Sequence, residues 1–162
     1  MDVVIFIGSE SDYELIKDAV GVLKEFGVSY RLEVTSAHRS PERTRALIAD
    51  SEKKGAKVFI AAAGRAAHLA GFVAGQTSAP VIGVPVESGG LGGLDALLST
   101  VQMPKGVPVA AMGLGKAGAS NAAILAVQIL GVKNPLLKKK LDAHKKTMAA
   151  QVESASKKLP QS

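Results

Sequence analysis

The chain has 162 residues, the size of one ordinary domain that can bury its own core. It contains no cysteine, which excludes disulfides, zinc–thiolate sites, iron–sulfur clusters and cysteine nucleophiles. The formal net charge of +6 is carried by residues 133–162, whereas residues 1–132 are neutral overall. Because aromatic residues make up only 4% of the chain and are not interleaved with basic ones, we expect no nucleic-acid partner.

The sequence predicts neither a signal peptide nor a membrane span. The first residues lack the basic region and the long apolar stretch of a signal peptide. No apolar run approaches the roughly 20 residues that cross a bilayer. We therefore expect a cytoplasmic protein with no membrane partner, and the absence of cysteine fits a reducing compartment.

Apolar runs that indicate strands alternate with segments of helical spacing. The first run, Val3–Ile7, is continuous, as is typical of a central parallel strand buried on both faces. The predicted strands cover residues 3–7, 29–35, 57–62, 80–85 and 107–112. The predicted helices cover residues 15–26, 41–54, part of 64–75, 92–101 and 119–130. This alternation predicts an α/β fold with a parallel sheet covered on both faces, and five strands favour a flavodoxin-like order.

The last segment, residues 135–159, is predicted to be a Lys-rich helix with a narrow apolar stripe. The stripe consists of Leu137, Leu141, His144, Met148, Val152, Ala155 and Leu159. Since this helix follows a complete sheet, its stripe packs either on a neighbouring subunit or across its own domain. We divide the chain into a domain of residues 1–132 and a helical extension of the same domain, residues 133–162.

A loop between the second strand and the second helix carries the strongest chemical signal. Ser36, His38 and Arg39 precede Ser40 and Pro41, which are predicted to start the helix, with the Ser40 hydroxyl capping its free amides. An imidazole exchanges protons near neutral pH, and a guanidinium suits bidentate contact with phosphate. We therefore interpret the loop as a ligand site at the carboxyl end of a parallel strand.

The loop after the first strand, residues 8–12, is a second candidate for phosphate binding. Gly8 allows close backbone approach, and the helix that follows presents free amides and a positive dipole end. The segment matches neither the G-x-G-x-x-G pattern nor the P-loop, so dinucleotide or ATP binding is not predicted. Ordinary helix capping is the alternative interpretation of Ser11 and Asp12.

The third loop, residues 61–71, combines small side chains with Arg65 and His68. The small side chains either let the backbone of this loop come close to a ligand, or they allow tight packing of a helix on the sheet with His68 as a buried imidazole. Gly-rich segments at residues 88–95 and 102–106 are either loops that close over a ligand or plain connections.

The three histidines, at positions 38, 68 and 144, do not have the spacing of a metal-binding motif, so no metal is predicted. The residues alone indicate a phosphate-bearing small-molecule site with histidine acid–base chemistry.

Six ordered segments of the chain resemble the family of N5-carboxyaminoimidazole ribonucleotide mutases and aminoimidazole ribonucleotide carboxylases of purine biosynthesis. These segments are residues 8–12, 36–39, 66–69, 92–97, 101–104 and 121–123. The resemblance implies a three-layer α/β/α enzyme without cofactor that makes 4-carboxy-5-aminoimidazole ribonucleotide from a ribonucleotide substrate and CO2. It also implies a homo-oligomer, usually an octamer. Of the two placements of the C-terminal helix that its apolar stripe allows, we favour packing on a neighbouring subunit.

The resemblance further implies roles for residues at matching positions. Ser9, Ser36 and Arg39 would hold the ribose phosphate, and Asp12 would hold the ribose hydroxyls. His38 would be the catalytic proton shuttle. In the mutase reaction, one imidazole serves both proton transfers as the carboxyl group moves through CO2.

His68, a second catalytic residue, and Gly64 would surround the carboxyl group or CO2. Most mutases have glycine at position 65 and proline at position 70, where this chain has Arg65 and Ala70. Arg65 resembles the direct carboxylases, whereas His68 resembles the mutases. We favour the mutase, with direct carboxylation of aminoimidazole ribonucleotide by CO2 as the alternative. A nucleotide-binding module without catalysis is the further alternative.

Overall fold

A five-stranded parallel sheet lies at the centre of the computed structural model, which describes residues 1–160. Its strand order, β2-β1-β3-β4-β5, confirms the predicted flavodoxin-like order. The strands are β1 (Val3–Ile7), β2 (Tyr30–Val34), β3 (Val58–Gly64), β4 (Val81–Val86) and β5 (Ala110–Ala111). β2 is added on one side of β1, and β3, β4 and β5 are added on the other side. Where the order of the strands switches in this way, between β1 and β3, a crevice forms at their carboxyl ends.

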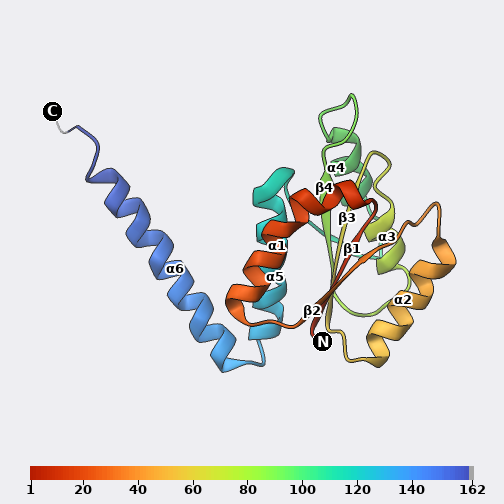
Figure 1. Ribbon diagram of the computed structural model, residues 1–162, viewed down its shortest axis with the longest axis horizontal. Helices are drawn as coiled ribbons and strands as arrows, with labels where there is room; N and C mark the ends of the chain where they lie inside the picture. The colour runs from red at the N-terminus through yellow and green to blue at the C-terminus, as the bar shows by residue number, and fades with distance from the viewer. Residues whose placement is uncertain (161–162) are drawn as a thin grey trace.

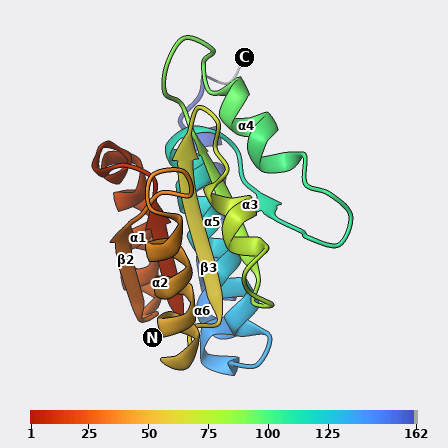
Figure 2. The same ribbon diagram turned by 90° about the vertical axis from the view of Figure 1, so that its right-hand side faces the viewer.

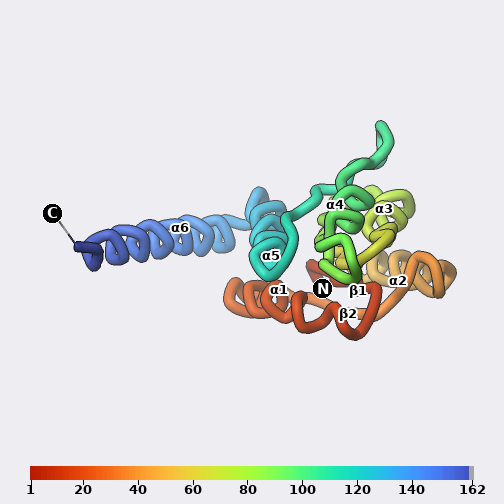
Figure 3. The backbone as a smooth tube through the Cα atoms, turned by 90° about the horizontal axis from the view of Figure 1, so that it is seen from above, coloured from red at the N-terminus to blue at the C-terminus, as the bar shows by residue number. Residues whose placement is uncertain are grey.

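Helices cover both faces of the sheet, as the alternating sequence pattern predicts (Figures 1 and 3). They are η1 (Glu10–Asp12), α1 (Tyr13–Phe26), α2 (Pro41–Lys53), α3 (Leu69–Ala74), α4 (Leu94–Val101), α5 (Gly115–Gly131) and α6 (Pro135–Ser156). The helices α1 and α5 pack on one face, and α2 and α3 pack on the other. The loops after β1, β2 and β3 therefore gather at one end of the sheet (Figure 2).

The side chains of β1 show why a continuous apolar run forms a central strand. Val3 and Ile5 join the core under α1 and α5, whereas Val4 and Phe6 join the core under α2 and α3. Every residue of β1 is buried. Phe6 also lies beside Phe59 of β3, with ring centroids 5.8 Å apart. The strand thus contributes apolar area to both layers.

Several predicted boundaries differ from the structure, among them those of β5, β3 and α5. β5 spans two residues instead of 107–112, and near its predicted start Pro108 has no amide to donate to the ladder. β3 continues to Gly64, two residues beyond its predicted end. α5 begins at Gly115, four residues before its predicted start, and a Cβ on Gly118 would lie 1.7 Å from the Gly113 carbonyl oxygen. The first turn of α5 contains glycines instead of apolar residues, so the apolar pattern did not predict it. These glycines are required for the close turn before the helix.

The helix α6 packs on its own domain only over its first turns. Asn134 caps it by accepting hydrogen bonds from two helix amides, and Leu137 is buried against α5. Lys140 donates to the Phe26 carbonyl oxygen at 2.7 Å. The His144 ring also meets the Phe26 ring of α1 edge to face, with centroids 5.6 Å apart. Beyond His144 the helix leaves the domain (Figure 1), and Val152 is 70% exposed. Within residues 1–160, no helix combines the length and apolar character that a membrane crossing requires.

Candidate active site

A cavity of about 650 Å³ lies at the carboxyl ends of β1, β2, β3 and β4. The four loops that follow these strands supply its walls. All seven residues singled out from the sequence line it: Ser9, Asp12, Ser36, His38, Arg39, Gly64 and His68. The topology therefore brings together residues that are up to 59 positions apart in the chain.

The first wall is the turn between β1 and α1, which is held by a reciprocal pair of capping hydrogen bonds. The Ser9 amide donates to Asp12 Oδ2 at 3.0 Å, and the Ser9 side chain caps the short helix η1 in return. Asp12 is only 7% exposed, and this burial raises the pKa of its carboxyl group, against the lowering effect of the Ser9 and Gly8 amides and Arg39. The predicted capping role is met only in part: Asp12 completes the capping box of η1, but its side chain makes no cap bond to α1, and the Ser11 hydroxyl donates to Ser9 Oγ. The Asp12 side chain also lines the cavity.

Gly8 lies where β1 ends and faces the cavity. A Cβ placed on it would lie 3.5 Å from Ala63 Cβ and 3.6 Å from Asp12 Oδ2, which are ordinary contacts. Packing within the chain thus does not require glycine here. The missing side chain instead leaves the backbone accessible from the cavity.

The second wall is the β2–α2 loop, in which two serines hold the backbone around His38. Ser36 Oγ accepts a hydrogen bond from the Arg39 amide at 3.1 Å. The prediction that Ser40 caps α2 is wrong: its hydroxyl makes no cap bond and instead accepts from the Ser36 amide at 3.1 Å. The closed loop offers Ser40 a nearer amide than those of the helix. Pro41 does begin α2, as predicted.

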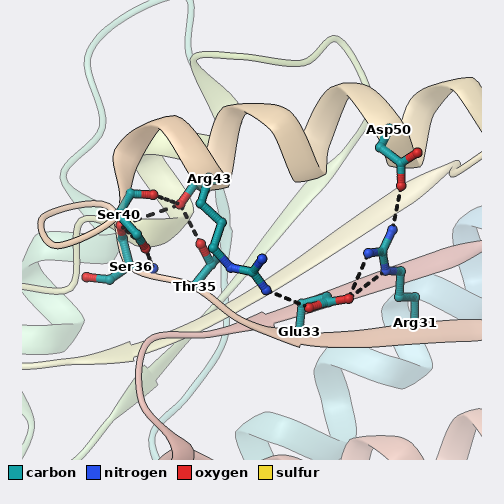
Figure 4. A network of polar contacts seen from close by, with 8 residues as sticks. Arg31, Glu33, Thr35, Ser36, Ser40, Arg43 and Asp50 are labelled. Carbon is teal, nitrogen blue, oxygen red and sulfur yellow. Dashed lines mark hydrogen bonds and ion pairs between the residues drawn. The ribbon is translucent and has the colours of Figure 1, made fainter.

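A network of ion pairs anchors α2 to β2 and so supports this loop (Figure 4). Arg31 pairs with Glu33 and with Asp50, in each case at 2.7 Å. Arg43 reaches Glu33 from the first turns of α2 at 2.9 Å. Because these pairs lie at both ends of the helix, they fix its position along the strand as well as its distance from it.

Arg39 joins the first two walls. Its Nη2 donates to the Gly8 carbonyl oxygen at 2.9 Å, across 31 positions of sequence. This bond uses one of the five N–H groups of the guanidinium and leaves others directed to its surroundings. The cation is therefore held at the end of β1, beside the amides of the first turn.

The third wall brings His68 against His38. The distance between His38 Nε2 and His68 Nδ1 is 2.6 Å, and the rings meet edge to face with centroids 4.8 Å apart. One nitrogen of this pair must donate its proton to the lone pair of the other. Because both imidazoles are exposed, the alternative of a buried, structural His68 is wrong.

Gly64 is held by the fourth wall, the loop after β4. A Cβ placed on Gly64 would lie 2.0 Å from Ser88 Oγ and 2.9 Å from the Val86 carbonyl oxygen. The glycine is therefore needed for the approach of two strand ends. Ser88, which belongs to the Gly-rich segment 88–95 but had no predicted role of its own, lines the cavity two residues after β4 ends. None of residues 102–106 lines the cavity.

The charges of the cavity favour an anionic ligand. Arg39 and Arg65 line it, and Asp12 is its one carboxylate. Within residues 1–160, no group of three or more histidine, cysteine or acidic residues is arranged to hold a metal ion. The site thus combines two guanidinium groups, a pair of imidazoles, and serine hydroxyls near helix amides.

A flavodoxin-like fold with this cavity defines an α/β protein that binds a small anionic ligand and can exchange protons with it. The model of the AIR carboxylase family matches residues 2–151, and the chain belongs to this family.

Comparison with individual proteins agrees with this assignment. The chain is 49% identical over 155 residues to the N5-carboxyaminoimidazole ribonucleotide mutase of Pyrococcus horikoshii, covering 96% of this chain and 86% of the relative. It is 48% identical to the mutase of Bacillus subtilis, covering 96% of both chains. A crystal structure of Treponema denticola PurE superimposes with a TM-score of 0.89 at 29% identity, covering 98% of each chain.

Proposed function

We propose that this protein is an N5-carboxyaminoimidazole ribonucleotide mutase of purine biosynthesis. It converts its substrate to 4-carboxy-5-aminoimidazole ribonucleotide, with aminoimidazole ribonucleotide and CO2 as intermediates. The observation that carries the proposal is the contact between His38 Nε2 and His68 Nδ1, 2.6 Å apart, inside a cavity lined by two arginines. The similarity to mutases over nearly the whole chain supports it.

In this proposal the phosphate of the nucleotide binds where the first two walls meet. Ser9 Oγ accepts from the Ser11 hydroxyl at 2.9 Å, and Ser36 Oγ accepts from the Arg39 amide. Both serine oxygens thus use acceptor capacity within the protein, which leaves their O–H groups to donate to phosphate oxygens. Arg39 supplies the charge, and Asp12 accepts from the ribose hydroxyls.

His38 moves the proton in both halves of the reaction. As the N–C bond to the carboxyl group breaks, its electron pair stays on the exocyclic nitrogen, which takes a proton from His38, and CO2 is released. Carbon C4 then forms a bond to CO2, and His38 takes the proton that C4 loses. The proton given and the proton taken balance, so the reaction is a net isomerisation.

His68 and Gly64 have supporting roles in this scheme. The hydrogen bond from one imidazole to the other fixes the orientation of the His38 ring and its tautomer. The small side chains on either side of Gly64 and Arg65, Ala63 and Ala66, leave room for CO2 between the two steps. Retention of CO2 between the two steps requires that bound substrate shield this part of the cavity from water.

The decisive experiment supplies the purified protein with each of two substrates. Conversion of N5-carboxyaminoimidazole ribonucleotide at low bicarbonate is the expected result. Efficient use only of aminoimidazole ribonucleotide with bicarbonate would identify a direct carboxylase instead. Binding without conversion of either would identify a nucleotide-binding module. The His38→Asn variant is expected to fold and bind nucleotide while losing about 100-fold or more in kcat.

We also propose that the protein is a homo-oligomer, an octamer by resemblance to its family, and that it acts in the cytoplasm. Residues 133–162 are then an extension of the catalytic domain that contacts a neighbouring subunit. Exposed apolar residues support this on α6, where Met148 is 45% and Val152 is 70% exposed. A second exposed set lies on and before α4: Leu91, Leu94, Leu98 and Val101. Sedimentation of wild type and Val152→Glu tests the proposal, and a wild-type monomer would refute it.

A further inference from the structure

Arg65 is the one charged residue of the cavity to which the proposed reaction assigns no task. Among residues 1–160 it is also the only residue other than glycine with a positive φ, at 55°. This left-handed conformation is unfavourable for a residue with a Cβ, whereas glycine adopts it freely. Such residues gather at functional sites, where the surrounding structure holds them. The backbone conformation thus indicates that Arg65 is present for its side chain.

The packing of the strand ends explains how this conformation is held. The preceding residue, Gly64, lies so close to the β4–α4 loop that a Cβ on it would be 2.0 Å from Ser88 Oγ. The chain must turn away directly after this contact, at Arg65. A Cβ placed on Gly89 would lie 3.8 Å from Arg65 Nε, so the side chain runs beside the same loop and lines the cavity.

The guanidinium of Arg65 has no anionic partner within the described part of the chain. Arg31, Arg43 and Arg45 each pair with a carboxylate, but no ion pair among residues 1–160 includes Arg65. Asp12, the one carboxylate of the cavity, is bound to the Ser9 amide after β1. A guanidinium matches the two oxygens of a carboxylate in geometry as well as charge. The fork of Arg65 is therefore open to an anionic group of a ligand.

Arg65 and Arg39 are anchored at different ends of the cavity. Arg39 is bound to the Gly8 carbonyl oxygen at the end of β1, and Arg65 lies beside Gly89 after β4. In the sheet, β3 separates β1 from β4. With neighbouring strands about 4.8 Å apart, β1 and β4 are about 10 Å from each other across the sheet. The cavity thus presents two cations to a ligand that is anionic at both ends.

We propose that Arg65 binds the carboxyl group that the reaction transfers and is a specificity-determining residue of this active site. The inference rests on the proposed mutase activity, whose substrate and product each carry a phosphate at one end and a carboxylate at the other. With the phosphate at Arg39, the carboxylate reaches the end of the cavity where Arg65 lies. Arg65 exchanges no proton and forms no covalent bond. It contacts the group as a carboxylate before and after transfer.

The test compares two nucleotides that differ in the carboxyl group. The affinities of 4-carboxy-5-aminoimidazole ribonucleotide and of aminoimidazole ribonucleotide without bicarbonate are measured by calorimetry for wild type, Arg65→Gly, Arg65→Lys and Arg39→Gln. Lys53→Gln, which removes an exposed cation at the far end of α2, is the matched control. Arg65→Gly is expected to bind the carboxylated nucleotide at least about tenfold more weakly and to change the affinity for the other less than twofold.

The remaining variants make the pattern specific. Arg65→Lys is expected to recover part of the loss, because it keeps the charge without the fork. Arg39→Gln is expected to lower the affinity for both nucleotides by the same factor. Thermal unfolding gives an independent readout, because Arg65→Gly relieves the backbone and is expected to raise Tm by about 2–4 °C while binding falls.

Two results would overturn the inference and leave the proposed function intact. In the first, wild type converts substrate and Arg65→Gly binds both nucleotides with normal affinity. In the second, wild type converts substrate and Arg65→Gly loses affinity for both nucleotides equally. A wild type that binds neither nucleotide overturns the inference together with the proposed function.

Discussion

The contact between Gly64 and Ser88 allows a sharp test of how the site is built. In Gly64→Ala, the new Cβ would lie 2.0 Å from Ser88 Oγ and 2.9 Å from the Val86 carbonyl oxygen, whereas ordinary contacts begin at 3.4 Å. The ends of β3 and β4 must therefore separate by more than an ångström, or the Ser88 side chain must rotate away. Overpacking of this kind costs about 1–3 kcal/mol.

The expected loss of stability is a fall in Tm of about 2–4 °C for each kcal/mol in a chain of this size. Activity is expected to fall more steeply. His68 follows Gly64 by four residues, and a displacement of about 1 Å at a reacting group can cost about 100-fold in rate. Thermal unfolding and kcat with N5-carboxyaminoimidazole ribonucleotide measure the two effects separately.

Two further variants make this prediction refutable. Ser88→Ala removes the oxygen at 2.0 Å, so adding it to Gly64→Ala is expected to recover part of both losses. Gly21→Ala is the matched control, because a Cβ on Gly21 of α1 meets no atom within 4 Å; it is expected to stabilise by about 0.5–1 kcal/mol. A Gly64→Ala variant with unchanged Tm and kcat, or no recovery with Ser88→Ala, would refute the reasoning.

Three more predictions concern charged side chains. Burial raises the pKa of Asp12, so its ionisation opposes folding above the unfolded pKa of 3.8; Asp12→Asn is expected to be at least as stable as wild type at pH 7, with the difference shrinking toward pH 4, while nucleotide affinity falls. Urea unfolding across pH checks this. Lys57 lowers the pKa of Asp2, whose contribution is present at pH 7 and is lost as the pH falls below 3.8 and through the lowered pKa. Lys57→Gln should cost about 0.3–1 kcal/mol at pH 7 in the same assay, and progressively less as the pH falls below 3.8. Lys140→Met removes the bond to the Phe26 carbonyl oxygen and should cost about 1 kcal/mol, measured by thermal unfolding.

Elements whose signals are local were predictable from the sequence. The continuous run Val3–Ile7 predicted a strand buried on both faces, Gly27 predicted the end of α1, and Pro41 predicted the start of α2. The prediction that Ser40 caps α2 was wrong because several backbone amides compete for one side-chain hydroxyl, and in the folded loop the nearest amide is that of Ser36. The extent of β5 failed because the partners of an edge strand depend on the path of its loop as well as on its apolar residues.

The candidate site followed from topology, and its internal geometry did not. Loops at the carboxyl ends of adjacent parallel strands must meet, so the clustering of His38, Arg39 and His68 was accessible to sequence reasoning. The 2.6 Å contact between two imidazoles depends on side-chain rotamers from two loops. The left-handed backbone of Arg65 depends on the Gly64–Ser88 contact, which brings together residues 24 positions apart. Such features arise only when the strands have paired.

Several locally unfavourable features of this chain lie in the cavity. Asp12 carries a buried carboxylate and Arg65 a left-handed backbone, while His38 and His68 hold two titratable rings in contact. Each has a neutral or glycine substitute that would fold at lower cost. Such features are typical of functional sites, where the surrounding structure holds them. We therefore expect stabilising single substitutions in a deep mutational scan to be enriched among cavity residues and to lower activity there, and a scan with stabilising substitutions spread evenly over the surface would contradict this account.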